Sequence, residues 1–408
     1  MSDTRRWSIV CLLSLGMIIA YIDRSNLSVA LADKQFIKEF QLTSTDRGLL
    51  NSYFFWTYAF LQIPAGFLVD RYGVKFPYAA GFAFWSLVSA GAAFITSIPQ
   101  LIGLRLLLGI GESVVTPASL RWIRFNIGEK QRGLAVGLYM AGTKAGPAIG
   151  APLAAWLISY YGWRYMFMIL GFGCLLWLIP WLTLVKNNDR ELEANFVRQT
   201  NSKPISFAKL FSTRLMWGII IGTFCYNYFV YFCMTWLPAY FAESRGLSLQ
   251  KSGAFTGFSF GGMAIMATLA GFAADRMIAR GADSVKTRKG FTIAGLLVAS
   301  TEIIGAFAPS NDVALLFAIV SLTGLGLATA NYWALTQTLM PGAAIGRIAG
   351  VQNMASNLSG IVAPIITGFL RDATGSYNTP IYAVGVILLI GVASYVFMVD
   401  AKYVPKAD

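Results

Sequence analysis

Five ionisable side chains stand inside long apolar runs of this 408-residue chain: Asp23, Arg24, Arg105, Glu112 and Lys144. If these runs cross a membrane, each ionised side chain at the bilayer centre costs about 2.5–3.5 kcal/mol, and the five together cost about 12–17 kcal/mol. We therefore expect them to face one another or a wet cavity. Because the chain has no histidine, any proton chemistry must use carboxylates, tyrosines or lysine.

The spacing of these residues limits which of them can pair. Asp23 and Arg24 are adjacent, so on a helix they point about 100° apart and each needs a partner on another helix. Arg105 and Glu112 are seven residues apart, which places them on one helix face about 10 Å apart. Such charges could form a structural ion-pair network or line a path for an anionic substrate, whose carboxylate a guanidinium matches well. Lys144 could balance Glu112 or contact the substrate.

The composition predicts that these runs do cross a membrane. Hydrophobic residues make up 56% of the chain, charged residues 12%, and the mean hydropathy is +0.60. Ordinary globular domains are about a quarter charged. The four cysteines lie in apolar runs without disulfide or zinc spacing, so we expect no metal site.

Windows of about 20 apolar residues predict twelve membrane-spanning helices. They lie near 7–30, 47–69, 75–97, 99–120, 133–160, 162–185, 215–242, 251–274, 289–308, 311–335, 343–370 and 377–399. We predict an all-α membrane protein with one six-helix bundle over 1–185, a polar cytoplasmic linker over 186–214 and a second six-helix bundle over 215–408.

The lysines and arginines predict the orientation of these spans. With the N-terminus inside, 22 of the 32 lie on the cytoplasmic side, seven lie outside and three lie within spans. Both termini are then cytoplasmic. Because the net charge of +13 follows this topology, we do not expect nucleic acid as a partner.

The two halves of the chain repeat each other. GFLVDRYGVK (66–75) follows span 2, and GFAADRMIARG (271–281), with Asp275 and Arg276, follows span 8. Spans 5 and 11 are both punctuated by glycine and proline. Parallel repeats of six helices around a polar linker are typical of two-bundle transporters.

GFLVDRYGVK resembles the signature of the major facilitator superfamily at each of its defining positions. These are Gly66, Leu68, Asp70, Arg71, Gly73 and Lys75. Within that superfamily the chain is similar to the anion:cation symporters, which include bacterial sugar-acid carriers and animal vesicular glutamate and sialic acid carriers. The segments that carry this resemblance are YIDRSNLSVA, SYFFWTYAFLQIPAGFLVDRYG, RLLLGIGESVVTPA, WLPAYF and GVQNMASNLSGIVAP.

This resemblance implies proton-coupled uptake of a small organic anion, most simply a sugar acid, across the inner membrane of a bacterium. It implies a monomer that works by alternating access, with the proton as coupling ion and no cofactor. It implies that Asp23 and Glu112 carry protons. It further implies that Arg105 binds the substrate carboxylate with support from Arg24. Tyr21 and Asn353 match positions that contact substrate hydroxyls.

Further polar residues could serve the substrate or hold helices together. Asn51 and Tyr58 share one face of span 2, and Gln352 lies in span 11 beside Asn353. Amide side chains inside a membrane also form hydrogen bonds between helices, so both roles stay open. We expect Asp70 and Arg71, at the cytoplasmic end of span 2, to latch the two bundles together.

Other functions agree less well with the sequence. An exchanger of organic anions fits the same charges, and GTKAGPAIG (142–150) resembles a motif of drug/proton antiporters. A transporter-like sensor would usually carry a longer cytoplasmic tail. The histidine in span 2 and the arginine in span 7 of vesicular carriers are missing, which argues against their chemistry. No nucleophile–base set, metal cluster or phosphate loop indicates an enzyme.

Overall fold

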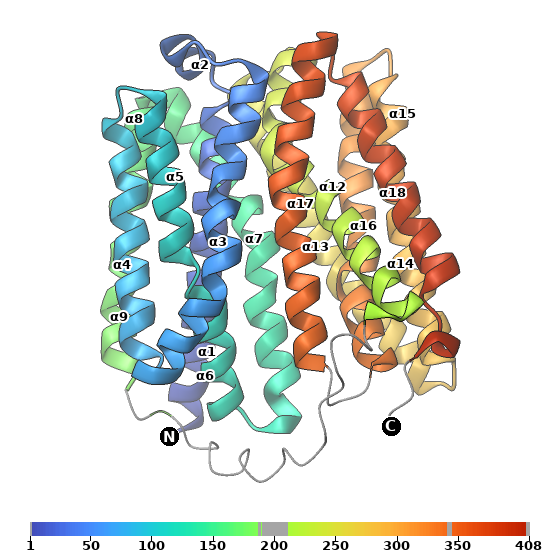
Figure 1. The fold of residues 1–408 in the computed structure, drawn as a ribbon. Helices are drawn as coiled ribbons and strands as arrows, with labels where there is room; N and C mark the ends of the chain where they lie inside the picture. The colour runs from blue at the N-terminus through green and yellow to red at the C-terminus, as the bar shows by residue number, and fades with distance from the viewer. Residues whose placement is uncertain (1, 187–188, 190–210, 341–344, 405–408) are drawn as a thin grey trace.

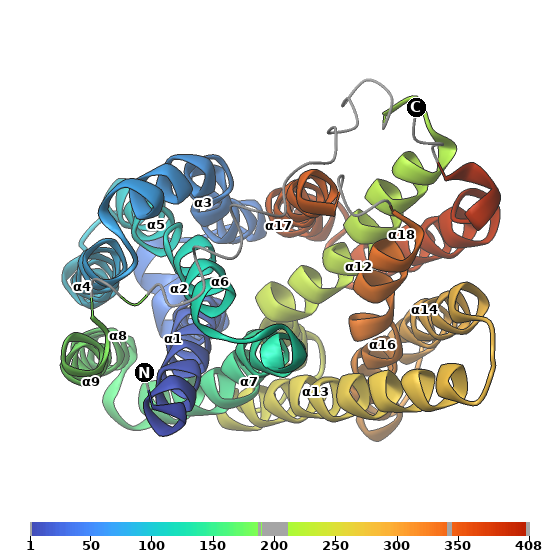
Figure 2. The same cartoon turned by 90° about the horizontal axis from the view of Figure 1, so that it is seen from below.

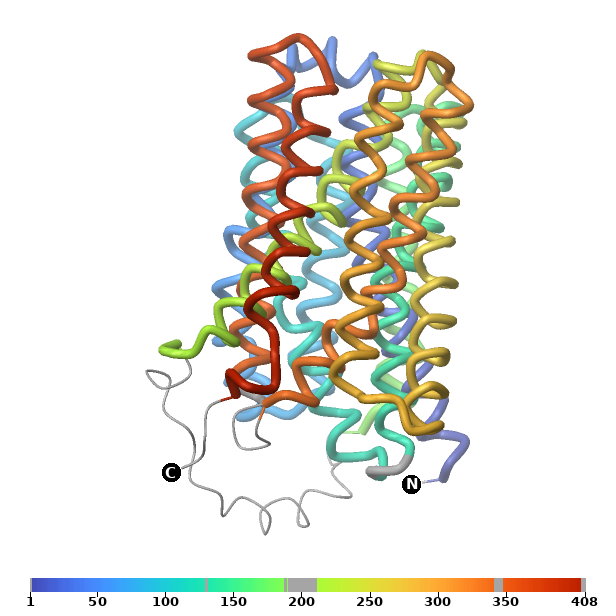
Figure 3. The backbone as a smooth tube through the Cα atoms, turned by 90° about the vertical axis from the view of Figure 1, so that its right-hand side faces the viewer, coloured from blue at the N-terminus to red at the C-terminus, as the bar shows by residue number. Residues whose placement is uncertain are grey.

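The computed structural model describes residues 2–186, 189, 211–340 and 345–404. Within these residues every regular element is a helix, and none is a strand. The long helices run roughly along one direction (Figure 1) and form one block when seen from the side (Figure 3). The prediction of an all-α protein is confirmed.

The helices of the first half begin and end at recognisable local signals. Thr43 and Asp46 form a capping box at the start of α3, and Gly73 and Gly162, with φ of 81° and 86°, follow the ends of α3 and α7. The bounds are α1 (Asp3–Ala30), α2 (Lys34–Phe40), α3 (Ser44–Tyr72), α4 (Lys75–Gly91), η1 (Ala92–Phe94), α5 (Ile98–Glu112), α6 (Val115–Asn126), α7 (Glu129–Tyr161), α8 (Trp163–Cys174), η2 (Leu175–Trp177) and α9 (Leu178–Leu184).

The second half follows the predicted linker 186–214, most of which lies outside the described residues. Serine and threonine caps again start several helices, such as Thr213 before α12 and Ser310 before α16. The bounds are α12 (Arg214–Ala239), η3 (Tyr240–Ser244), α13 (Leu249–Ala279), α14 (Ser284–Ser300), α15 (Glu302–Ala306), α16 (Asn311–Leu339), α17 (Ile345–Thr374), α18 (Asn378–Met398) and η5 (Ala401–Tyr403).

Each predicted span coincides with a helical segment whose ends lie within a few residues of the prediction. Two features were not predicted: the short helix α2, and the break between α5 and α6 at Ser113 and Val114. Nine segments in the described part of the chain are long and apolar enough to cross a membrane. The other three predicted spans, α3, α4 and α7, are helical but not among those nine, so the count of twelve stays a prediction.

The helices before and after the linker form two groups that meet along two lines, α3 against α17 and α7 against α13 (Figure 2). Glycines allow this close approach. A Cβ on Gly48 of α3 would collide with the carbonyl oxygen of Pro364, and one on Gly257 of α13 would lie 2.7 Å from the carbonyl oxygen of Ala148. Both ends of the described chain lie on the same side of the block, as the predicted orientation requires (Figure 1).

Candidate functional site

A buried ion pair joins α1 to the end of α5. Nε of Arg24 donates to Oε2 of Glu112 over 2.8 Å, and the two residues are only 3% and 0% exposed. The rings of Tyr21 and Tyr58 each lie 4.4 Å from the Arg24 guanidinium, and the ring of Phe54 lies 4.7 Å from it. Charge pairing and these aromatic faces together compensate the buried guanidinium.

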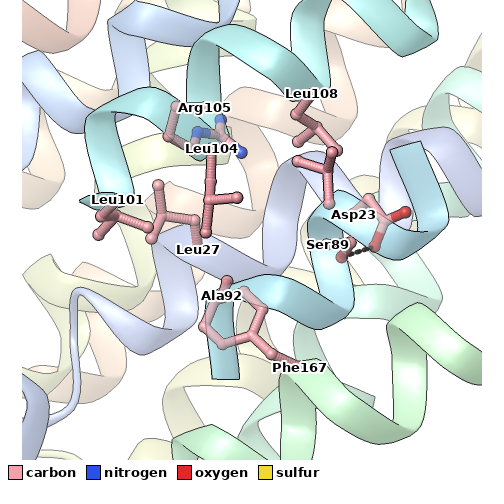
Figure 4. A pocket seen from close by; sticks show the side chains of 10 residues that line it. Asp23, Leu27, Ser89, Ala92, Leu101, Leu104, Arg105, Leu108 and Phe167 are labelled. Carbon is pink, nitrogen blue, oxygen red and sulfur yellow. Dashed lines mark hydrogen bonds between the residues drawn. The ribbon is translucent and has the colours of Figure 1, made fainter. Parts of the chain in front are cut away.

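Asp23 faces the opposite way, into a small cavity between α1, α4 and α5 (Figure 4). Its Oδ1 accepts from Oγ of Ser89 over 2.9 Å and from Nδ2 of Asn26 over 3.3 Å. Arg105 lines the same cavity from α5, and Figure 4 shows it apart from Asp23, across the leucines. The cavity of ≈ 20 Å³ has room for a water molecule but not for a sugar acid.

Arg105 makes one hydrogen bond within the described residues, from Nε to the carbonyl oxygen of Leu50 over 3.3 Å. Its guanidinium lies 5.4 Å from the ring of Phe54, which thus contacts both Arg24 and Arg105. The terminal nitrogens of Arg105 have no bond to another described side chain and are left for a ligand. Such nitrogens can bind a carboxylate in a bidentate manner.

Each carboxyl group of this site keeps one oxygen without a partner. Oδ2 of Asp23 and Oε1 of Glu112 are buried and accept no hydrogen bond from the described residues. A buried carboxylate oxygen without a donor is unfavourable, whereas a protonated oxygen loses most of that penalty. Both groups therefore have an atom at which a proton can sit.

Lys144 does not balance Glu112, which was one of its two expected roles. Glu112 pairs with Arg24, and the Lys144 ammonium makes no ion pair or hydrogen bond within the described part of the chain.

The predicted amide residues hold helices together in this structure. Asn51 accepts from Oγ of Ser28 over 3.2 Å and donates to the carbonyl oxygen of Arg47 over 3.1 Å. Gln352 donates from Nε2 to the hydroxyls of Thr223 and Thr336, each over 3.1 Å. Both amides are buried, so a substrate would have to displace these bonds in order to reach them.

Asn353 bridges the two groups of helices by donating from Nδ2 to Oε1 of Gln62 on α3 over 2.5 Å. Gln62 was not predicted, although it lies one turn after Tyr58 and so shares its face of α3. Nε2 of Gln62 is buried without a partner among the described residues, so this pair retains a donor for a substrate hydroxyl.

The signature segment does not latch the two groups of helices in this structure, contrary to our expectation. Asp70 pairs with Arg121 and Asp275 pairs with Arg288, each within its own half of the chain. The Arg71 guanidinium lies over the ring of Tyr72, 5.3 Å from its centroid. Lys75 also stays within its own half, because its Nζ donates to the carbonyl oxygen of Leu182 over 2.8 Å. Arg276 lies on the last turn of α13. A Cβ on Gly66 would meet nothing within 4 Å, so this glycine makes no close helix contact here.

The bridging contacts lie instead at the opposite end of the block, where sequence reasoning expected none. Arg47, in the first turns of α3, is 4% exposed and pairs through Nη1 with Oε1 of Glu243 over 2.7 Å. Oε2 of Glu243 accepts from the hydroxyl of Tyr377 over 2.9 Å. Asp372, near the end of α17, accepts from the backbone N–H groups of Ser44 and Thr45 over 3.0 and 2.7 Å. These bonds hold the two groups of helices together at that end of the block.

The family model described as Major Facilitator Superfamily matches residues 13–364. The chain is 30% identical to the D-galactonate transporter of Escherichia coli O6:H1, covering 98% of this chain and 97% of that protein. It is 28% identical to a probable galactarate/D-glucarate transporter of Escherichia coli strain K12, covering 97% and 94%. A bacterial homologue of the human lysosomal transporter Spinster, in an inward-facing and occupied conformation, superposes with a TM-score of 0.84 at 17% identity over the whole of both chains.

Proposed function

We propose, since this chain belongs to the Major Facilitator Superfamily, that it takes up a sugar acid together with protons. The family and its relatives are transporters, so the chain is an integral membrane transporter and not an enzyme. Its relatives are named for a galactonate, with one carboxylate, and for galactarate and glucarate, with two. A sugar acid as substrate is the class that these names support.

The pairing of Arg24 with Glu112 carries the proposal. Protonation of Glu112 removes the negative charge that pairs with the Arg24 guanidinium. In a medium of low dielectric constant, the unpaired guanidinium strongly favours the binding of another anion nearby. Binding of a proton and binding of a substrate carboxylate therefore favour each other. Asp23 and Arg105, which line one cavity, supply a second acid and a second guanidinium for the same exchange.

The roles of individual residues follow from their free atoms. Glu112 and Asp23 carry the protons on their unpartnered oxygens, and Arg105 binds the substrate carboxylate with its terminal nitrogens. Tyr21 stacks on the Arg24 guanidinium, and its hydroxyl, which lies beside that of Tyr231, contacts a substrate hydroxyl. Asn353 and its partner Gln62 contact a further substrate hydroxyl, with Asn353 in the second half of the chain.

We infer that the outer end is closed in this structure. The inference is supported by the bonds of Asp372 and by the Arg47–Glu243 pair, which lie at the end away from the chain termini, the outer end in the predicted orientation. When the transporter opens toward the cytoplasm, the carboxyl groups release their protons inside and re-form their pairs with the arginines. The substrate anion is thereby displaced into the cytoplasm.

Proton coupling also meets the energetic requirement for uptake. An anion that enters a cell at −100 mV rises by about 2.3 kcal/mol per charge. One proton per negative charge cancels this term, and a further proton makes uptake favourable. We propose that the protein does this as a monomer in the cytoplasmic membrane, with no cofactor besides the proton.

The test is the current and the uptake of labelled acid by proteoliposomes of the purified protein when sugar acids are offered, with and without an inward proton gradient. The expected result is inward positive current for an acid with one carboxylate, or gradient-driven uptake without current for an acid with two, lost in Arg105→Ala in either case. Uptake that does not respond to the proton gradient and requires liposomes preloaded with an anion would replace proton symport by exchange. Asp23 and Glu112 would then serve only to balance the arginines.

A further inference from the structure

Within the described residues, Lys144 is the cation of the membrane-embedded set that makes neither an ion pair nor a hydrogen bond. Arg24 pairs with Glu112, and Arg105 shares a cavity with Asp23. The Lys144 side chain is half-buried, and within the residues that the structure describes no acid or acceptor binds its ammonium. A lone ammonium in this setting is costly unless it serves an anion that comes and goes.

The helix position of Lys144 directs its side chain toward the other half of the chain. Ala148 lies one turn further on, on the same face of α7. A Cβ on Gly257 of α13 would lie 2.7 Å from the Ala148 carbonyl oxygen and 2.9 Å from Cδ of Pro152, so this face packs against α13. Lys144 continues that face by one turn toward the cytoplasmic end of the helix.

The tight contact between α7 and α13 ends at the level of Lys144. The two helices run in opposite directions, so Gly261, one turn beyond Gly257, lies roughly opposite Lys144. A Cβ on Gly261 would meet nothing within 4 Å, in contrast to one on Gly257. Lys144 therefore lies at the level where this close contact between the two halves ends.

The same helix packing gives the offset between Lys144 and Arg24 along the helix axis. Gly150 of α7 packs on α1 at Ile22 and Ser25, which is the level of Arg24. Lys144 lies six residues before Gly150, so its backbone is about 9 Å from that level along the axis. A six-carbon chain with an acid group at each end, bound between two long cationic side chains, can span such an offset.

The charges in the membrane lead to the same class of ligand. When both acids are ionised, the five groups carry a net charge of +1, and with a proton on each acid they carry +3. A dianion brings the protonated site back to +1, the charge of the empty ionised site, whereas a monoanion leaves it at +2. Two protons also cancel the two charges of a dianion, so its uptake is driven by the pH gradient without net current.

We propose, on the basis of the function proposed above, that the substrate is a dianion of the aldarate type. One carboxylate binds at the arginine site, and the other binds the ammonium of Lys144. Lys144 thus determines specificity for the second acid group and takes no part in carrying protons.

The test compares ligands that differ only in the second carboxylate. Binding of D-gluconate and D-glucarate, and of galactonate and galactarate, is measured by titration calorimetry on the purified full-length protein in detergent. The variants are Lys144→Gln, Lys144→Arg and, as a matched loss of one exposed lysine, Lys251→Gln. Melting temperatures confirm that each variant folds, and Lys144→Met replaces Lys144→Gln if that variant does not.

We expect the wild type to bind each dianion at least about 10-fold more tightly than its monoanionic counterpart, the size expected for one hydrogen bond to a charged group. Lys144→Gln should lose this preference and bind the monoanions as the wild type does. Lys144→Arg and Lys251→Gln should keep it.

Equal binding of both members of each pair by the wild type would overturn the dianion proposal and leave sugar-acid transport standing. Equal weakening of both members by Lys144→Gln would also overturn it, because Lys144 would then support the site as a whole. If the folded wild type bound neither member of any pair, the proposed function would fail together with this inference.

Discussion

Nε of Arg24 lies 2.8 Å from Oε2 of Glu112, and this buried bond joins two helices that are 88 residues apart in the chain. Asp23 is adjacent to Arg24 in the sequence, but its side chain points in a different direction and accepts a hydrogen bond from Ser89. The adjacent acid and base of α1 therefore serve two separate partners. Each acid can take up a proton without a direct bond to the other.

Glu112→Gln should abolish accumulation driven by a proton gradient but preserve exchange of substrate across the membrane. Glutamine still accepts a hydrogen bond from Arg24 but cannot release a proton, so the carrier is fixed in its protonated form. The measurement is uptake of labelled sugar acid into proteoliposomes, first with a proton gradient and then with equal substrate on both sides.

Arg105→Ala is the matched comparison for this variant and should lose both activities, because it removes the group that binds the carboxylate. The assignment of roles fails if Glu112→Gln accumulates substrate at the wild-type level. It fails equally if Arg105→Ala exchanges substrate while Glu112→Gln does not.

Asp372→Asn should open the outer end of the transporter more often. The carboxylate accepts three bonds at the start of α3: from the N–H groups of Ser44 and Thr45 and, over 2.7 Å, from the hydroxyl of Thr45. It also neutralises the positive end of the α3 dipole. Losing the charge should weaken this closure by about 1–2 kcal/mol, or about 5–30-fold in population.

The opening is measured by labelling a cysteine at Phe55, which packs on Tyr231 of the other half at 4.7 Å between ring centroids, with an impermeant maleimide. The native cysteines are first replaced by alanine. Asp312→Asn, at an exposed position at the start of α16, is the control and should label as slowly as the parent. Equal labelling in both variants would show that Asp372 does not hold the outer end closed.

Gly48→Ala should hinder closure of the outer end. The added Cβ would collide with the backbone carbonyl of Pro364, which cannot move aside as a flexible side chain could. We expect faster labelling at position 55 and about a 5–150-fold loss of uptake, because overpacking typically costs about 1–3 kcal/mol. Gly290→Ala in α14, where a Cβ meets nothing within 4 Å, should transport normally. Normal uptake by Gly48→Ala would contradict the observed closure.

Glu39 should make the protein more stable at neutral pH than at acid pH. In α2, outside the membrane-spanning helices, it accepts bonds from Arg164 over 2.6 and 3.2 Å and from Nε1 of Trp163 over 3.1 Å. The bonds from Arg164 hold the pKa of Glu39 below its usual value. The stabilisation is therefore present above the unfolded pKa of about 4.3 and is lost as the pH falls through the lower folded value.

The pair is partly exposed, so its contribution should be no more than about 0.2–1 kcal/mol. Thermal unfolding in detergent at pH 7 and below pH 4 should show a smaller difference for Glu39→Gln than for the wild type. Asp3→Asn, at an exposed position at the start of α1, is the control. A pH dependence unchanged by Glu39→Gln would show that the pair does not couple to folding.

The sequence predicted the helices well because apolar length, caps and glycines act locally. The end of α3 at Gly73 and the end of α7 at Gly162 could both be foreseen from residue type alone. The short helix α2 was missed because its seven residues lie in a segment that reads as a polar loop.

The charges inside the membrane could be predicted from the sequence, but not how they pair. Composition and spacing identified Arg24, Arg105 and Glu112, yet nothing in the chain indicates that Glu112 selects Arg24 over Lys144. That choice depends on how α1, α5 and α7 are rotated about their own axes. The bonds of Asp372 were missed for the same reason, since they join residues 328 and 327 positions apart.

The most direct test of the account is the pH inside proteoliposomes, followed with a trapped indicator while sugar acid is added outside at equal starting pH. We predict that the lumen acidifies with the wild type and not with Glu112→Gln, because protons enter with the substrate. Accumulation of the labelled acid by the wild type with no change of internal pH would contradict proton symport.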